Sequence, residues 1–256
     1  MTDTEREMRR YAELAELAYT HARATFTDFL GIAEQDALHT AAREFPHVPY
    51  TLFGGTPDCE RVMARFGDED TLGYPPPAAY PILCIAITPN APKFAEPLSH
   101  RDLLGALMNL GIRREMLGDI FPGERVSYLF CCEKIAPFLA ENLTRVRHTA
   151  VSASVTECPE ELATPTYETE EILVSSERLD GIVAHAFGIS RAEAQGEIAA
   201  GKVFLDGRAA PDPTVTPRAG AQITLRGAGR LRYDGVAGVS RKGKLLVKIA
   251  RPANRK

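Results

Sequence analysis

The side chains of this 256-residue sequence that could do chemistry are concentrated in its last third, and their type suits phosphate binding. Residues 175–256 hold 15 of the 30 Lys and Arg side chains but only 7 of the 34 Asp and Glu side chains, a net charge of +8. The rest of the chain carries −12, which gives −4 overall. A protein that concentrates basic residues in this way is expected to bind a polyanion.

Two short helices are predicted to position the first of these basic side chains. Apolar residues recur at helical spacing from Leu179 to Phe187, and Gly188 is placed to end that helix. Ser190 and Glu193 have the spacing of a capping box, which predicts the start of a second helix. A strand over residues 202–205, a hairpin turn at residues 206–207 and a further strand over residues 222–226 follow.

This succession resembles the S-four RNA-binding domain, also called the αL motif. The resemblance covers residues 176–232 and is carried by RLDxxV, then GISRxxAQxxIxxGKVxLDG, then a glycine and a short strand. Asp206 stands where Asn is common in the family, and Ala221 where an Asp often follows the glycine. The sequence contains few aromatic residues, so stacking on single-stranded bases is expected to be minor and structured RNA is the favoured target.

The candidate RNA-binding residues follow from this resemblance and from the basic cluster. We expect the helix pair to present Arg178, Arg191 and Lys202 on one surface, beside a helix N-terminus that can receive a phosphate. Arg191 is expected to make no core contact, so that Arg191→Glu would leave the melting temperature unchanged or slightly raised. The full candidate set is Arg178, Ser190, Arg191, Gln195, Lys202, Arg208, Arg226, Arg230, Arg232, Arg241, Lys242 and Lys244.

The whole chain is predicted to be an α+β protein in three parts. Consecutive prolines at residues 75–77 separate a small α/β N-terminal domain, residues 1–78, from a middle domain, residues 79–157. Residues 158–171 contain five Glu, two Pro and no base, and are predicted to be a solvated acidic linker. The S-four domain with its basic β tail then occupies residues 172–256, a fragment expected to fold alone.

The first two domains have recognisable periodicities. In residues 1–78 we predict helices over residues 8–18, 28–45 and 57–66, and a strand over residues 48–53. In residues 79–157 we predict strands over 81–88, 120–121, 126–131 and 146–156, with helices over 99–110 and 133–143. Ser99 and Asp102 can cap the first of these helices and Gly111 can end it. The order β-α-β-β-α-β predicts a ferredoxin-like, split βαβ sandwich, similar to an RRM.

No catalytic residue, metal ligand or cofactor is predicted. His100-Arg101-Asp102-Leu103 has the letters of a kinase catalytic loop, but the required Asn and the other kinase motifs are missing. The motifs of pseudouridine synthases and tyrosyl-tRNA synthetases are incomplete or absent, as are a Walker loop and a dinucleotide fingerprint. A polar edge that touches RNA is an open alternative for His100, Arg101, Arg113 and Arg114.

The cellular compartment is expected to be the cytoplasm. The five Cys residues are odd in number, lack CxxC spacing and mostly lie in apolar runs, which is typical of reduced core thiols. The N-terminus has no apolar core of a signal peptide, and no run approaches the ~18 apolar residues of a membrane span.

The strings FGGTPDCER and LSHRDLLGALMNLGIRREMLGDI, together with the S-four pattern, resemble the YlmH-like family of bacterial proteins over nearly the whole chain. The resemblance implies a cytosolic, non-enzymatic RNA-binding protein. It also implies a link to large ribosomal subunits that hold peptidyl-tRNA during ribosome-associated quality control. Large-subunit ribosomal RNA is therefore the expected partner of a monomeric protein, with tRNA as a further candidate. Two alternatives stay open: an RNA-modifying or tRNA-processing enzyme with its site in residues 1–157, and a cell-division adaptor.

Overall fold

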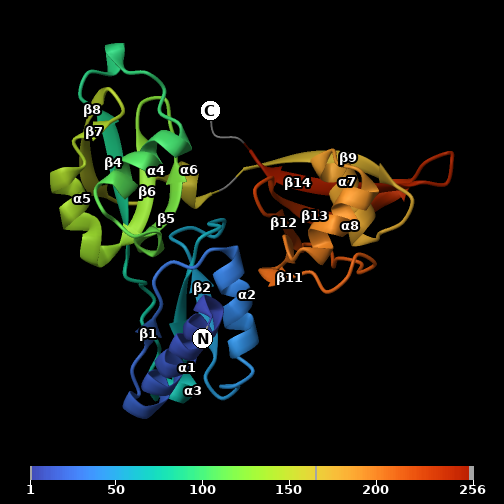
Figure 1. Ribbon diagram of the computed structural model, residues 1–256, viewed down its shortest axis with the longest axis horizontal. Coiled ribbons are helices and arrows are strands. Elements are labelled where there is room, and N and C mark those ends of the chain that lie inside the picture. The colour runs from blue at the N-terminus through green and yellow to red at the C-terminus, as the bar shows by residue number, and fades with distance from the viewer. Residues whose placement is uncertain (1, 165, 254–256) are drawn as a thin grey trace. The chain divides into compact units, whose positions relative to one another are not determined.

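The computed structural model describes residues 2–164 and 166–253, which form two compact units divided at residue 165 (Figure 1). The first unit contains a three-stranded sheet and a five-stranded sheet, and the second contains a six-stranded sheet. The structure is therefore of mixed α and β type, as predicted.

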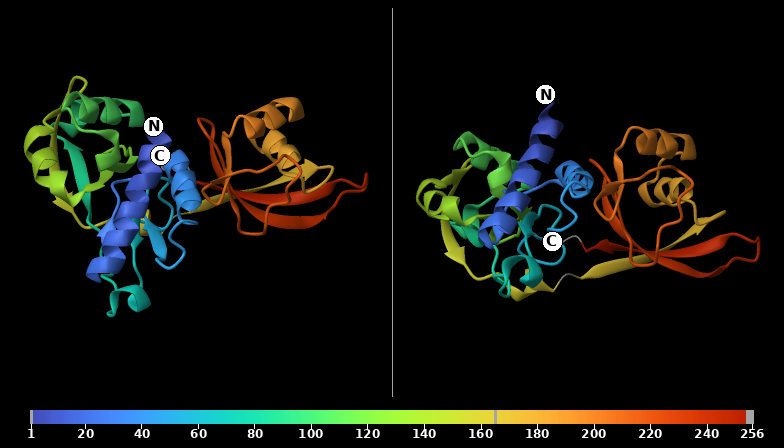
Figure 2. Two further views of the ribbon diagram at one scale, coloured as in Figure 1. Left: turned by 60° about the horizontal axis from the view of Figure 1, so that its bottom comes forward. Right: turned by 90° about the horizontal axis from the view of Figure 1, so that it is seen from below.

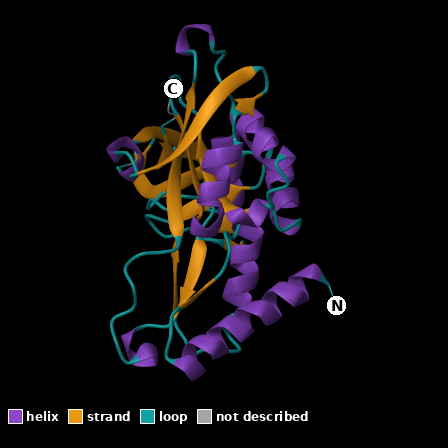
Figure 3. Cartoon of the chain, turned by 90° about the vertical axis from the view of Figure 1, so that its left-hand side faces the viewer, coloured by secondary structure: helices purple, strands orange, loops and turns teal. Residues whose placement is uncertain are grey.

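The N-terminal part of the first unit packs helices on a small antiparallel sheet. The helices are α1 (Asp3–His21), α2 (Ile32–Ala41) and α3 (Glu69–Leu72). The strands, in sheet order, are β1 (Thr25–Phe26), β3 (Met63–Phe66) and β2 (Tyr50–Phe53). Helix α1, the long helix next to the N-terminus in Figure 3, buries Tyr11, Ala15 and Ala18 against a core that includes Leu38 and Phe66.

Two helix predictions for this part need correction. The predicted helix over residues 57–66 is wrong, because residues 63–66 form the central strand β3. Met63, Ala64 and Phe66 are buried there between two neighbouring strands, and this tertiary pairing overrides the local pattern. The helix predicted over residues 28–45 is confined to Ile32–Ala41.

The middle part of the first unit is a five-stranded antiparallel sheet in the order β5-β6-β4-β8-β7. Its strands are β4 (Ile82–Pro89), β5 (Leu117–Phe121), β6 (Ser127–Cys132), β7 (Arg145–Val146) and β8 (Thr149–Thr156). Its helices are α4 (His100–Asn109) and α5 (Ala136–Asn142), with short 3-10 turns η1 (Pro92–Phe94), η2 (Arg114–Met116) and η3 (Glu133–Ile135). Strand β6 lies between β4 and β5, the two strands that α4 connects, which is the split βαβ order.

Local sequence signals in this middle part agree with the structure. The Ser99 hydroxyl and the Asp102 carboxylate form the reciprocal capping box at the start of α4. Leu103 and Leu107 of this helix are fully buried in the core beneath the sheet. Most of the strand predicted over residues 146–156 is present as β8, but its first residues belong to β7 and to a tight turn, with Arg147 at a positive φ of 53°.

The two parts of the first unit are joined by hydrogen bonds around Asp119 of β5. Its carboxylate accepts the backbone N–H groups of Glu60, at 2.6 Å, and Arg61, at 3.0 Å. The Arg61 guanidinium in turn donates to the backbone carbonyls of Leu117, at 2.9 Å, and Phe29, at 3.0 Å. Phe29 is buried with Phe130 in a shared apolar cluster. Residues 2–164 therefore form one unit although the sequence indicates two domains.

The second unit is an antiparallel sheet in the order β11-β10-β12-β13-β14-β9 with two helices over one face (Figure 2). Its helices are α7 (Leu179–Phe187) and α8 (Arg191–Ala199). Its strands are β9 (Tyr167–Val174), β10 (Val203–Leu205), β11 (Arg208–Ala209), β12 (Gln222–Leu225), β13 (Gly229–Val239) and β14 (Leu245–Pro252). Leu179, Ile182 and Ile198 of the helices pack on Val203 and Tyr233 of the sheet.

The acidic segment 158–171 is not a linker throughout. A short helix, α6 (Glu160–Ala163), lies in it, and residues 167–171 begin the edge strand β9, which pairs along its full length with β14. The carboxylate of Glu170 receives a 2.8 Å hydrogen bond from Arg251 of β14, and Tyr167 lies beneath the Arg232 guanidinium at 4.5 Å. The acidic side chains of β9 thus keep this edge of the sheet charged, and one of them pairs with a basic residue of β14.

The five cysteines are free thiols, and four of them are buried. Burial raises the pKa of Cys84 and Cys131 to about 12 and that of Cys132 to about 11, so these thiols stay protonated. Among the described helices, none combines the length and the apolar character that a membrane crossing requires.

Candidate nucleic-acid interface

A buried carboxylate in the first turn of α7 draws together three of the predicted RNA-binding residues. Asp180 has no solvent exposure, and its two oxygens accept five hydrogen bonds. Arg178 donates to it from Nε, at 3.2 Å, and Nη2, at 2.9 Å. Arg191 donates from the same two atoms at 3.1 Å each, and the Gln195 amide donates at 2.7 Å. One acid therefore holds two guanidiniums in fixed orientations.

Local structure explains how these side chains meet. The backbone N–H groups of Leu179 and Asp180 donate to the carbonyls of Val215, at 2.8 Å, and Pro213, at 3.0 Å, so the loop before β12 covers the start of α7. The Ser190–Glu193 capping box starts α8 as predicted, which places Arg191 at the first position of that helix. Gly188 ends α7 in the left-handed conformation at φ 66°, which allows the sharp turn between the two helices.

The electrostatics of this cluster favour an anionic ligand. Burial acts to raise the pKa of Asp180, but the hydrogen bonds from Arg178, Arg191 and Gln195 outweigh it and hold that pKa well below its usual range. The cluster of one carboxylate and two guanidiniums keeps a net charge of +1. The Arg178 and Arg191 side chains are 36% and 51% exposed, and each has used two of its five N–H donors on Asp180. The donors left over can contact phosphate from solvent.

The prediction that Arg191 makes no core contact is wrong, because its guanidinium is bound to a fully buried acid. Asp180 itself was not predicted as a site residue. Its only signal was its place in the RLD string, where an acid at the second position of a helix also fits simple helix-dipole stabilisation. The sequence could not show that residues 178 and 191, on either side of a helix, share this carboxylate.

The other predicted residues of this unit are spread over several surfaces. Lys202 lies beyond the other end of α8 and pairs with Glu197 at 3.0 Å. Arg208 and Arg226 are exposed, in β11 and in the turn after β12. Arg230 and Arg232 alternate along β13 with the buried residues Leu231 and Tyr233, so they occupy the sheet face opposite the helices. Arg232 is paired with Asp234 at 2.6 Å.

A second basic group lies at the tip of the long β13–β14 hairpin, which extends away from the rest of its unit (Figure 1). Arg241, Lys242 and Lys244 are all exposed in this turn. The structure thus brings Arg178, Ser190, Arg191 and Gln195 together, and it leaves the hairpin tip and the β12–β13 turn as separate basic positions.

In the first unit, the predicted RNA-contact residue Arg114 instead makes hydrogen bonds within the protein. Its guanidinium donates to the carbonyls of Leu117, at 2.8 Å, and Gly118, at 3.3 Å, and burial with the nearby Arg61 charge lowers its pKa to about 10. Arg113 pairs with Glu115 at 3.1 Å. His100 and Arg101 are exposed in the first turn of α4.

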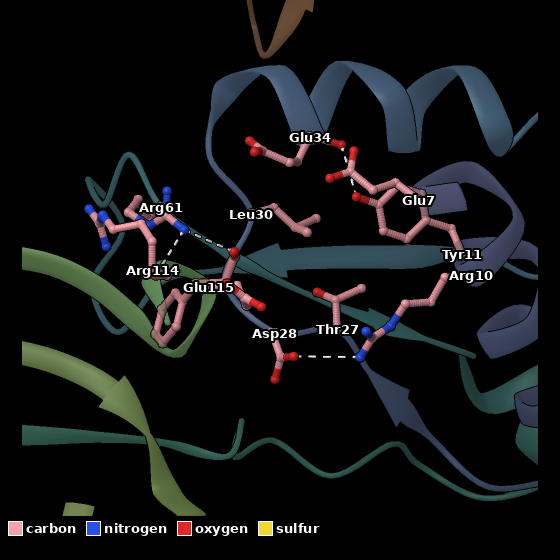
Figure 4. A pocket seen from close by; sticks show the side chains of 11 residues that line it. Glu7, Arg10, Tyr11, Thr27, Asp28, Leu30, Glu34, Arg61, Arg114 and Glu115 are labelled. Carbon is pink, nitrogen blue, oxygen red and sulfur yellow. Dashed lines mark hydrogen bonds and ion pairs between the residues drawn. The ribbon is translucent and has the colours of Figure 1, made fainter. Parts of the chain in front are cut away.

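A polar pocket of about 270 Å³ lies beside this junction, and Figure 4 shows Arg61 and Arg114 on one side of it and the Arg10–Asp28 pair on the other. Its lining includes no Ser, Cys, His or Lys side chain. Among the residues that the structure describes, no group of three or more His, Cys, Asp and Glu side chains is arranged to hold a metal ion. The half-buried Arg61 donates across the joint to the Leu117 carbonyl, whereas the half-buried Arg114 donates to carbonyls of its own part.

Comparisons with known proteins point to one class. Residues 75–160, which contain the five-stranded sheet, match a family model described as "Putative RNA-binding domain in YlmH". The Bacillus subtilis (strain 168) protein named "Ribosome-associated protein quality control protein P2" is 30% identical over 231 residues, which cover 90% of this chain and 88% of that protein. The chain therefore belongs to the YlmH-like family.

A solved structure titled "Cell division protein ylmH from Streptococcus pneumoniae" also aligns with the chain. The alignment covers 61% of this chain and 93% of that one, at 19% identity and a TM-score of 0.48. The family assignment rests on the Bacillus subtilis relative.

Proposed function

We propose that this protein binds structured RNA without catalysing a reaction, and that the guanidiniums held by Asp180 are its principal phosphate contacts. The observation that carries this proposal is the pair of half-exposed arginines oriented by one buried acid. Pre-orientation lowers the entropy that each side chain loses when it binds, so the remaining N–H donors are well placed to bind phosphate oxygens. Arg191 is the first residue of α8, so the positive end of the helix dipole lies beside its backbone and favours an anion there.

The RNA in this proposal is ribosomal. The chain matches, over most of its length, a relative whose name describes a ribosome-associated quality-control protein. We place this chain, as a monomer of the cytoplasm, on the large ribosomal subunit that holds peptidyl-tRNA. In this arrangement the second unit acts as an S-four domain on ribosomal RNA. The basic hairpin tip at Arg241, Lys242 and Lys244 reaches a neighbouring phosphate, or tRNA.

The experiment is a binding titration of the full chain with purified large ribosomal subunits. Arg178→Gln and Arg191→Gln each remove one oriented guanidinium, and each should weaken binding roughly tenfold or more, the loss of at least one charge-assisted contact. Lys248→Gln is the matched control, because Lys248 is an exposed basic residue of the same unit that is absent from the proposed surface. Circular dichroism at the titration temperature should show all three variants folded.

Equal affinities for all variants would contradict the proposal. Subunit binding that is unchanged in these variants but abolished by changes confined to residues 1–157 would favour the alternative of an enzyme or adaptor centred on the first unit.

A further inference from the structure

A polar groove of about 500 Å³ lies on the first unit, far in sequence from the Asp180 cluster. One wall is the exposed side of α4, where Arg101, Gly105 and Asn109 follow one another at intervals of four residues. The other wall is the end of α5 and the β7–β8 hairpin, including Arg145 and Arg147. The groove lies wholly within the residues matched by the RNA-binding family model.

The charge of the groove is positive and incompletely neutralised. It is lined by three arginines and one acid, Asp102. The acid is engaged by the Ser99 cap and lies 3.6 Å from Arg147. Arg147 is the groove arginine that pairs with this acid. Among the described residues, the guanidiniums of Arg101 and Arg145 form no hydrogen bond or ion pair. Two guanidiniums are therefore available to an anion.

The backbone at Arg147 supports a binding role. This residue adopts φ 53° in the two-residue turn between β7 and β8, a region that favours glycine and costs an arginine conformational energy. A glycine there would form the hairpin without strain. Its ion pair with Asp102 is long and half exposed, so it compensates little. A strained residue is an observation from which a functional role can be inferred.

Gly105 is a second, independent indication that the groove binds a ligand. It lies inside α4, where glycine is less favourable than alanine, and a Cβ added there would meet no atom within 4 Å. Packing within the chain therefore does not require this glycine. Its missing side chain instead opens the wall of the groove, so that a ligand backbone can approach the helix closely.

We infer that this groove binds a stretch of RNA backbone, with Arg101, Arg145 and Arg147 contacting phosphates and Asn109 and Asn142 contacting sugar or base edges. The Asn142 amide N–H is donated to the Phe138 carbonyl at 2.9 Å, which leaves its amide oxygen as an acceptor for a ribose hydroxyl. The inference deepens the proposed RNA-binding function and rests on it. It adds a second contact on the other unit, which would extend the RNA footprint beyond the Asp180 cluster.

The test uses the full chain and fluorescently labelled, protein-free large-subunit ribosomal RNA. Arg147→Gly removes the charge and relieves the positive φ, so the melting temperature should hold or rise while affinity falls roughly tenfold. Gly105→Glu and Gly105→Lys form a matched pair, since both replace glycine by a better helix former. Both should melt at or above the wild-type temperature, but Gly105→Glu should bind RNA at least roughly tenfold more weakly than Gly105→Lys.

Arg125→Ala is the control, because Arg125 is an exposed arginine of the same unit outside the groove. Its affinity should match that of the wild type. If the Arg147 and Gly105 variants bind RNA like Arg125→Ala while Arg178→Gln binds weakly, the groove inference is overturned and the proposed function stands. If only the groove variants lose affinity, the groove stands and the Asp180 cluster loses its assigned role.

A titration with poly-glutamate distinguishes an acidic protein partner. Groove variants that lose poly-glutamate binding but keep RNA affinity would overturn the inference in favour of an acidic segment. Loss of RNA affinity with no measurable poly-glutamate binding by the wild type supports RNA backbone as the occupant.

Discussion

The fully buried carboxylate of Asp180 and the half-exposed guanidinium of Arg191, eleven positions later on the next helix, are joined by two parallel hydrogen bonds of 3.1 Å. This pair links the starts of α7 and α8, and Arg178 completes it from the other side of the same acid. The orientations of two arginines that are predicted to bind phosphate therefore depend on Asp180, which is fully buried and cannot contact the RNA itself. Stability and binding are therefore coupled through Asp180.

Asp180→Asn should destabilise the second unit by about 1–3 kcal/mol, because the neutral amide cannot accept five hydrogen bonds and its own N–H groups face guanidinium donors. Urea unfolding of the variant and the wild type measures this difference. RNA affinity should fall as well, since both arginines lose their orientation. A variant with wild-type stability would show that the cluster contributes nothing to the fold.

The stabilisation from Asp180 should depend on pH in one direction. Its pKa in the folded protein is depressed, so the contribution is complete above the unfolded value of about 3.9 and is lost as pH falls through the lower folded value. The stability difference between the wild type and Asp180→Asn should be constant from pH 7 to pH 5 and shrink below about pH 4. A difference that grows on acidification contradicts the ionised, hydrogen-bonded state.

Arg191→Glu should lower the melting temperature of the second unit, in contrast to what the helix-dipole argument alone predicts. The new carboxylate would face the buried Asp180 charge, and this repulsion exceeds the roughly 0.3–1 kcal/mol gained at the helix N-terminus. Arg191→Lys serves as the comparison, because it keeps the charge but loses the two-pronged contact. Differential scanning calorimetry should rank wild type above Arg191→Lys and Arg191→Glu lowest.

Local signals in the sequence were sufficient for much of the fold. The Ser99–Asp102 and Ser190–Glu193 capping boxes, the end of α7 at Gly188 and the βαββαβ order are all present in the structure. These features depend on spacings of a few residues, which is why a single sequence reveals them. The S-four pattern of residues 176–232 also predicted Arg178, Ser190, Arg191 and Gln195 as candidate RNA-binding residues.

What could not be predicted depends on contacts between distant segments. Strand β3 is central because β1 and β2 flank it, and residues 167–174 form β9 because they pair with β14. Asp119 meets Glu60 and Arg61 across nearly 60 positions of sequence. The role of Asp180 could not be predicted from the sequence either, because it depends on contacts that form only when α7, α8 and the loop before β12 are folded together.

The position of β9 predicts the boundary of the second unit. A fragment of residues 166–256 should fold alone, because it contains the whole of β9, whereas residues 172–256 lack residues 167–171 and their pairing with β14. NMR amide dispersion should be native-like for the longer fragment, and its melting temperature should exceed that of the shorter one. Equal stabilities would mean that the first half of β9 adds nothing to the sheet.

The Asp119 junction predicts the behaviour of the first unit. Asp119→Ala leaves the backbone N–H groups of Glu60 and Arg61 without their acceptor, which should cost about 1–3 kcal/mol. Hydrogen exchange should accelerate at residues 60 and 61 and leave the amides of β14 unchanged. Faster exchange in both units alike would indicate that they unfold together.

The central claim is that oriented arginines of the second unit bind phosphates of ribosomal RNA, and the salt dependence of binding to large ribosomal subunits tests it most directly. If roughly 6 basic side chains contact phosphates, log K should fall with log salt at a slope of about −4 to −5. In the Arg178→Gln/Arg191→Gln double variant the slope should become shallower by about 1–2, while Lys248→Gln should keep the wild-type slope. Binding that is independent of salt, or a double variant with the wild-type slope and affinity, would contradict the account.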